Sequence, residues 1–168
     1  MPSLLDFEPL GDNVAVKITV SVEYALQALT EIAHQDEVPL SAQEISSRQA
    51  ISTKYLESIL RKLTNAGILV SSRGPQGGYR LSRSADEVTV ADVIRAIEGP
   101  LAAVGDRAPE ETKYRRTAKH LTEVWIATRI ALRDVLERIT LAEIVTGDFD
   151  SRLKQALKRR DAWSRRTK

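Results

Sequence analysis

The chain contains no cysteine and only two histidines, His34 and His120. Without thiols there can be no disulfides, thiolate zinc sites, cysteine nucleophiles or cysteine-held iron–sulfur clusters. Catalytic triads and three-histidine metal sites likewise have few candidate residues. We therefore expect no catalytic site, no bound metal and no cofactor.

Aromatic residues and long apolar runs are also scarce. Only 5% of the 168 residues are aromatic, so the core must be mostly aliphatic. No apolar run approaches the ~20 residues that cross a bilayer, and the first six residues lack the basic start and apolar stretch of a secretory signal. We expect a cytoplasmic protein without membrane contact, in one domain or a small domain with an appended element.

Positive charge is concentrated at one end of the chain. The formal net charge is +2, but residues 151–168 hold eight basic residues and one acid, so this tail carries +7 and residues 1–150 carry −5. Basic blocks are typical of contact with a polyanion. The tail could equally be a solvated, disordered end.

Helix signals begin after an irregular leader. Residues 1–16 contain two prolines and no clear period, and we expect them to form an N-terminal extension outside the fold. Residues 20–33 carry an apolar stripe at helical spacing, which predicts a helix. Ser41 and Glu44 form a capping box that opens a short helix ending near Arg48.

A second short helix and a hairpin follow at once. Ser52 offers the N-cap of this helix, and Gly67 suits the left-handed residue just past its end. The apolar period then changes from 3.6 to 2, and strands at 68–72 and 79–82 flank a glycine-rich turn at 73–78. Two short helices joined by a tight turn and followed by a hairpin make a winged helix-turn-helix.

The rest of the chain is predicted to be helical. A helix begins at Thr89 and stops at Gly99, and residues 99–109 form a linker. Residues 110–139 give the longest helical signal, 30 residues or ~45 Å at 1.5 Å per residue. Thr140 caps one further short helix. The predicted fold class is mainly α with a small β-hairpin.

The outward face of the second helix suits base recognition. Its apolar positions must face the core, which leaves Lys54, Glu57 and Arg61 together on the opposite side. A recognition helix places such side chains on base edges in the major groove, where Glu57 could accept a hydrogen bond from a cytosine amino group. The alternative is a solvated face with a Glu57–Arg61 ion pair.

The hairpin turn carries a second nucleic-acid signal. Glycines let its backbone pass close to another backbone, and Arg73 suits the narrow, electronegative minor groove. A phosphate-cradling loop would need a helix after the glycines, where a strand follows here, and a plain surface hairpin is the other alternative. Serines and threonines at helix starts can hold phosphates, although most are ordinary caps. The residues expected to contact double-stranded DNA are Ser41, Ser52, Thr53, Lys54, Tyr55, Glu57, Arg61, Arg73, Gly74, Pro75, Gln76, Gly77, Gly78 and Tyr79.

Motifs along residues 17–145 resemble a known family. They read KIT at 17–19, YAL at 24–26, ISSRQ at 45–49, ISTKYLE at 51–57 and RGPQGGYRL at 73–81. Together they resemble the IscR/NsrR/CymR family (the Rrf-two type) of bacterial winged-helix regulators. The resemblance implies a homodimeric, sequence-specific DNA-binding repressor or activator. The positions that match the family's recognition helix and wing arginine are Ser52, Thr53, Lys54, Glu57 and Arg73.

The chain departs from the family in two places. Family chains usually begin where Val16 and Lys17 stand here, so residues 1–15 are an extension or translation starts at Val16. Many members hold an iron–sulfur cluster on three cysteines, whereas residues 99–120 contain none. Carboxylates and His120 are poor substitutes for thiolates, so we expect a solvated or hydrogen-bonded His120. The chain resembles the cluster-free branch, the alternative being engineered cysteine-to-alanine changes.

The long helix carries a seam for a second copy of the chain. Its apolar positions alternate at spacings of four and three, as in a coiled coil. An amphipathic helix of this length cannot fold back wholly on a small winged domain, so a two-fold partner helix is its natural cover; the alternative is an intrachain core helix. The predicted interface comprises Leu121, Val124, Trp125, Thr128, Leu132, Val135 and Ile139.

These observations predict a winged helix-turn-helix domain at 17–98, a linker at 99–109, a dimerisation helix and a short helix at 110–146, and a basic tail at 147–168. The predicted function is a homodimeric transcriptional regulator, a repressor, that binds a pseudo-palindromic operator without an iron–sulfur cluster. Its effector, a small molecule or a protein, is left open. The alternative function is a winged-helix protein-interaction module controlled by a metabolic partner.

Overall fold

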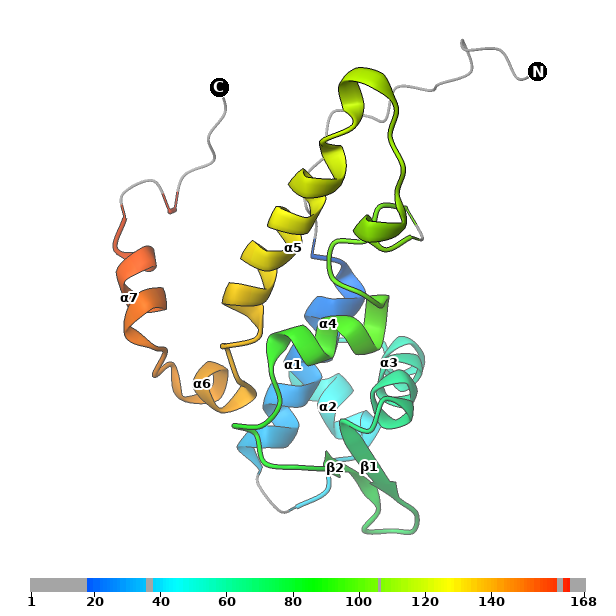
Figure 1. Cartoon of the computed structure of the whole chain (residues 1–168). Coiled ribbons are helices and arrows are strands. Elements are labelled where there is room, and N and C mark those ends of the chain that lie inside the picture. Colours follow the sequence, from blue (N-terminus) through cyan, green and yellow to red (C-terminus); the bar gives the residue numbers. More distant parts are fainter. Residues whose placement is uncertain (1–17, 36–37, 106, 160–161, 164–168) are drawn as a thin grey trace, which may run out of the picture.

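The computed structural model describes residues 18–35, 38–105, 107–159 and 162–163. Helices dominate, with one two-stranded antiparallel sheet (Figure 1), which confirms the predicted fold class. The predicted extension at 1–16 and most of the last nine residues of the basic tail lie outside the described residues. Within the described ranges, no helix has the length and hydropathy needed to cross a membrane.

The elements follow the predicted order closely as far as residue 98. The helices and strands are α1 (Val20–His34), α2 (Ala42–Gln49), α3 (Thr53–Asn65), β1 (Leu69–Ser72), β2 (Gly78–Leu81), α4 (Val90–Glu98), the 3₁₀ turns η1 (Pro109–Glu111) and η2 (Arg116–Ala118), α5 (Leu121–Leu136), α6 (Leu141–Thr146) and α7 (Ser151–Leu157).

An aliphatic core holds the winged domain together, as the scarcity of aromatic residues predicts. Helix α1 is central and packs against α3, α4 and α6. Leu29 of α1, Leu60 and Leu63 of α3 and Leu141 of α6 are fully buried, and burial of each such side chain contributes roughly 1.5–3 kcal/mol. Because α6 joins this core, the chain returns to the winged domain after α5.

Local start signals position most helices. The three capping boxes expected from the sequence are present at Ser41–Glu44, Thr89–Asp92 and Thr140–Glu143. Gly67, just past α3, has a φ of +73° as predicted. Ser52 occupies the N-cap of α3, but its side chain makes no capping hydrogen bond.

The hairpin is fixed to the start of α2. Its strands pair from Leu69–Leu81 to Ser72–Gly78. A further pair of backbone hydrogen bonds joins Tyr79 to Leu40, just before α2, with N–O distances of 2.8 and 3.0 Å. The return strand therefore lies between β1 and the backbone that leads into the helix pair.

The predicted long helix is wrong in its first third. Helix α5 spans 16 residues rather than 30, because residues 109–120 form two 3₁₀ turns and extended backbone. Four basic residues crowd residues 113–119 without an acid among them, and such like-charge spacing disfavours a helix. Arg116 adopts a left-handed φ of +54°, which a right-handed helix does not contain.

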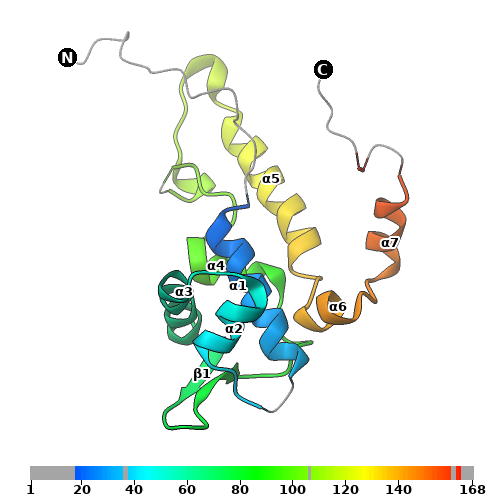
Figure 2. The same ribbon diagram turned by 180° about the vertical axis from the view of Figure 1, so that it is seen from behind.

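Helix α5 begins at the end that lies far from the winged domain and runs toward that domain. The chain then turns through α6, and α7 runs beside α5 (Figures 1 and 2). No residue of α5 or α7 is buried. In the described part of the C-terminal third, α5 and α7 are therefore only partly covered by the rest of the chain.

Candidate DNA-binding surface

The turn between α2 and α3 sets the angle of the helix pair. Ala50 ends α2 in the left-handed region, with a φ of 53°. The Ser46 hydroxyl then donates to the Ile51 carbonyl at 2.6 Å and shares a hydrogen bond with the Thr53 hydroxyl at 2.8 Å. Thr53 is therefore engaged inside the turn, at the first residue of α3, with its side chain half-buried.

Helix α3 presents the polar face that the sequence predicts. Leu56, Ile59, Leu60 and Leu63 are buried, and this one-sided burial points Lys54, Glu57 and Arg61 to solvent. No partner for Lys54 or Arg61 is found in the described part of the chain, and the alternative Glu57–Arg61 ion pair is absent from it. These charges are free to meet a ligand.

The hairpin lies beside this face, so that the two form one concave surface. A hollow of ≈ 320 Å³ runs between them and is lined by Glu57, Arg61, Thr64, Asn65, Ser71 and Tyr79. The polar face of α3, predicted from an apolar period of 3.6, and the hairpin, predicted from a period of 2, therefore lie side by side. A surface of this kind can follow a nucleic-acid groove and its bordering backbone.

Two hairpin glycines are explained by the chain's own backbone. A Cβ at Gly78 would lie 2.6 Å from the Leu40 carbonyl carbon and oxygen, and a Cβ at Gly77 would lie 2.4 Å from the Ser72 carbonyl oxygen. Neither distance is tolerable, so both positions require glycine for the hairpin to close and to pack on α2.

The hairpin tip itself is open to solvent. Arg73, Gly74, Pro75 and Gln76 are all exposed, and Gly77 N–H donates to the Gly74 carbonyl at 2.9 Å to close the turn. Arg73 has no partner within the described residues. A free guanidinium on a narrow tip suits insertion into a minor groove.

Besides Thr53, two further predicted contact residues are occupied within the chain. The Ser41 hydroxyl donates to Glu44 at 2.6 Å as part of the capping box. The Tyr55 hydroxyl and Ser21 Oγ are 2.6 Å apart, and the Tyr55 ring meets Tyr24 edge-on with centroids 5.8 Å apart. The structure therefore places Tyr55 on the side of α3 that faces α1.

Sequence reasoning missed three polar residues on the same surface. Thr64 and Asn65 line the hollow one turn beyond Arg61, and Ser71 lies on β1. Helical spacing from Arg61 could have indicated Asn65. The place of Ser71 depends on how the hairpin packs against α3, for which a single sequence gives no signal.

Residues 99–120, where the family resemblance implies cluster cysteines in many members, offer a different donor set here. His120 is exposed and its Nδ1 lies 3.3 Å from Glu123 Oε1. Glu110 pairs with Arg129 at 2.7 Å, and its own backbone amide and that guanidinium lower the pKa of Glu110. Within the described ranges no three histidine, cysteine or carboxylate side chains gather to hold a metal. These residues do not fit an iron–sulfur cluster.

The apolar seam of α5 divides between two sides. Leu132 and Leu136 face the chain's own winged domain, where they line a small pocket with Val22 and Ile94. The opposite edge stays open, with Val124 and Val135 each 50% exposed. Ile130, 53% exposed, lies on a further face and was not predicted.

Known proteins share this arrangement. The sequence pattern of the Rrf2 family, described as "Iron-dependent Transcriptional regulator", matches residues 18–147. The regulator CymR of Bacillus subtilis is 35% identical over 132 residues, which cover 78% of this chain and 91% of CymR. IscR of Pectobacterium carotovorum is 33% identical over 163 residues, which cover 90% of this chain and 91% of IscR.

Solved structures agree with the sequence matches. The structure of B. subtilis CymR, titled the global cysteine regulator of that organism, superposes with a TM-score of 0.66 at 34% identity, covering 79% of this chain and 98% of that one. T. potens IscR superposes with a TM-score of 0.64 at 31% identity, covering 79% of this chain and 88% of that one.

The curated relatives are named HTH-type transcriptional regulators and not enzymes. This confirms the predicted regulatory function and does not favour the alternative of a protein-interaction module. With its helix-turn-helix, its hairpin and a family match over most of its length, the chain is a DNA-binding transcriptional regulator that belongs to the Rrf2 family.

Proposed function

We propose that this regulator is a cytoplasmic homodimer that represses transcription from a pseudo-palindromic operator and does so without an iron–sulfur cluster. The observation that carries the proposal is the concave surface formed by α3 and the hairpin, with Lys54, Arg61 and Arg73 exposed and unpaired within the described chain.

On this proposal, α3 enters the major groove with Lys54 and Glu57 toward base edges, while the tip places Arg73 in the adjacent minor groove. The hydroxyl of Ser52 makes no capping bond and is free for a phosphate oxygen. An operator bound by two protomers would then present two half-sites about 34 Å apart.

The dimer is supported by the state of α5. A 16-residue helix without a buried residue is unusual in a folded domain, because amphipathic helices gain stability mainly by covering their apolar face. The half-exposed Val124 and Val135 give a second copy an apolar strip to cover. The effector that controls binding, a small molecule or a protein, is not indicated by these features.

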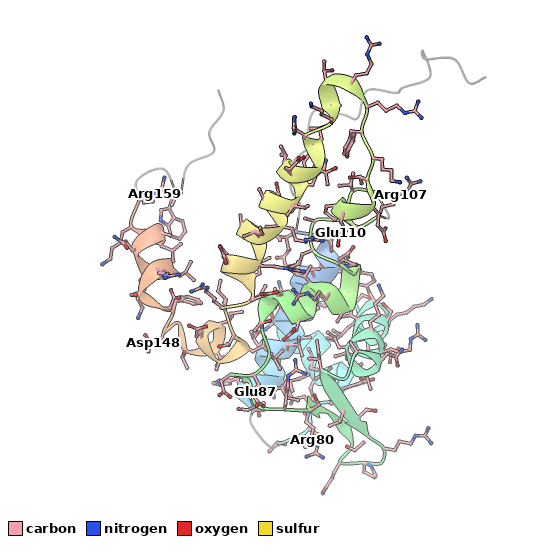
Figure 3. The ribbon with its side chains drawn as sticks, in the orientation of Figure 1. Arg80, Glu87, Arg107, Glu110, Asp148 and Arg159 are labelled. Carbon is pink, nitrogen blue, oxygen red and sulfur yellow. The ribbon has the colours of Figure 1, made fainter. Side chains whose placement is uncertain are left out.

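The test uses a duplex selected from a random library by the purified full-length protein. Fluorescence anisotropy at fixed salt should show two protomers per palindromic duplex. Lys54→Ala and Arg73→Ala should each weaken binding at least tenfold, since each removes one contact in both protomers and a specific base contact is worth about 1–3 kcal/mol. Arg107→Ala is the matched control, because Arg107 is exposed but lies far from the hairpin residue Arg80 (Figure 3). Wild-type affinity in both test variants would overturn the proposal.

A further inference from the structure

Helix α7, which lies beyond the family's matched span, encloses a groove together with α5. The family pattern ends at residue 147, and α7 begins at Ser151. The two helices run side by side in both views (Figures 1 and 2), and between them lies a cavity of ≈ 280 Å³. Its lining comprises Asp134, Val135, Arg138, Ile139, Glu143, Asp150, Arg152, Leu153 and Ala156.

We infer that α7 is the second wall of a groove that receives the N-terminal half of α5 from the partner subunit, in antiparallel orientation. Each α7 would then clasp the other protomer's α5. This inference rests on the homodimer proposed above, and it assigns to the region beyond the family match a role in assembly.

The apolar surface of α5 continues into the groove. Val124, Ala131 and Val135 are separated by seven and four residues, so they share one face of the helix. Val135 lines the cavity, and Val124 extends the same face toward the start of α5, where it is 50% exposed. A partner helix lying along this face would therefore be led into the cavity.

The facing side of α7 is apolar as well. Leu153 and Ala156 line the cavity, and Leu157 is 39% exposed at the end of the helix. Trp163, 79% exposed, donates from Nε1 to the Leu157 carbonyl at 2.7 Å and lengthens this rim. A seven-residue helix with no buried residue is stabilised by its apolar face only if another surface covers that face.

Charge decides the orientation of the partner. Residues 113–119, just before α5, hold four basic side chains and no acid. In a parallel pair the two basic segments would lie together and repel each other. In an antiparallel pair the two basic segments lie apart, each near the partner's groove, whose lining holds the acids Asp134, Glu143 and Asp150 beside the bases Arg138 and Arg152.

The cavity fits side chains better than a small-molecule ligand. Its volume of ≈ 280 Å³ is close to the roughly 300 Å³ at which ligand pockets begin, so the chemistry of the lining decides between the two. The arginines and carboxylates of its lining are of both signs, so they do not favour a ligand of one charge. Apolar side chains from a partner helix match the Val135, Leu153 and Ala156 walls.

The absence of native cysteine permits a direct test by disulfide trapping. Two full-length, differently tagged variants, Val124→Cys and Leu157→Cys, are co-expressed, purified as heterodimers and oxidised. A disulfide between the two tagged chains is expected. The matched control replaces Val124→Cys by Ile130→Cys, which is similarly exposed but lies on another face of α5 and should not cross-link.

A second measurement follows dimer dissociation by analytical ultracentrifugation. Leu157→Glu should raise the dissociation constant by roughly tenfold or more, because one leucine burial is lost in each half of the dimer. Gln155→Glu adds the same charge to another face of α7 and should leave the constant unchanged.

The outcomes separate this inference from the proposed function. A DNA-binding dimer that traps no Val124–Leu157 disulfide, or that traps the Ile130 control instead, overturns the clasp and leaves the dimeric regulator standing. The same holds if a small ligand fills the groove and Leu157→Glu leaves the dimer intact. A protein that stays monomeric on its operator overturns both.

Discussion

The Ser41 hydroxyl holds the start of α2 through its capping box. It donates to Glu44 at 2.6 Å and accepts from the Glu44 amide at 3.2 Å. Ser41→Ala should therefore lower the free energy of unfolding by about 1 kcal/mol at neutral pH, measured by urea denaturation. Ser47→Ala, on the exposed side of the same helix, should cause no comparable loss.

The same cap makes the effect depend on pH. Hydrogen bonds from Ser41 lower the pKa of Glu44. A carboxyl with a lowered pKa in the folded state stabilises that state above its unfolded pKa, and the stabilisation is lost as the pH falls through the folded value. The difference between wild type and Ser41→Ala should therefore narrow as the pH drops below 4.5. A difference that stays constant would contradict this account.

Tyr55 tests whether a residue predicted to contact DNA is instead structural. Its hydroxyl lies 2.6 Å from Ser21 Oγ, so Tyr55→Phe and Ser21→Ala should cost similar stability, up to about 1 kcal/mol. The double variant should lose little more stability than either single variant. If Tyr55→Phe weakens operator binding and Ser21→Ala does not, the tyrosine contacts DNA directly.

At the scale of elements, Gly78 couples the hairpin to the helix pair. A Cβ there would lie 2.6 Å from the Leu40 backbone and 3.0 Å from the Ser41 nitrogen. Gly78→Ala should therefore destabilise the fold by about 1–3 kcal/mol and weaken operator binding, because the hairpin must shift away from α2. Thermal unfolding measures the first effect, and Gln76→Ala at the exposed tip should leave the unfolding temperature unchanged.

Elements with local start and stop signals were predictable from the sequence. The boxes at Ser41, Thr89 and Thr140 join residues three apart, so their geometry is encoded within one turn. The start of α5 was not predictable. Residues 110–120 have the apolar periodicity of a helix, but the left-handed Arg116 and the hydrogen bonds of Thr112 fix another conformation there. One of those hydrogen bonds is donated by Thr122 of α5, so it depends on the packing of this segment against that helix.

The candidate site was predictable in its parts but not in its arrangement. Helical spacing alone is enough to place Lys54, Glu57 and Arg61 on one face. The engagement of Tyr55 with α1 and the hollow shared by α3 and β1 involve residues far apart in the chain. A single sequence carries periodicity but not these long-range distances.

At the scale of the whole molecule, two-fold symmetry doubles the effect of each charge on DNA binding. Binding constants fall with salt with a log–log slope of about −0.9 per neutralised phosphate. If Arg61, which is not assigned to a base edge above, neutralises one phosphate in each protomer, Arg61→Ala should make that slope shallower by about 1.8. Anisotropy titrations between about 50 and 200 mM salt measure the slope. A change near half that size would indicate that one protomer binds alone.

The backbone pairing of Tyr79 with Leu40 has a consequence for how such a regulator could respond to a signal. Because the hairpin and the helix pair are joined by main-chain hydrogen bonds, each winged domain is a stiff unit whose internal shape resists adjustment. A signal is then expected to change the separation or tilt of one winged domain relative to the other in the dimer. Operator spacing, rather than half-site sequence, would be the variable to which the control is most sensitive.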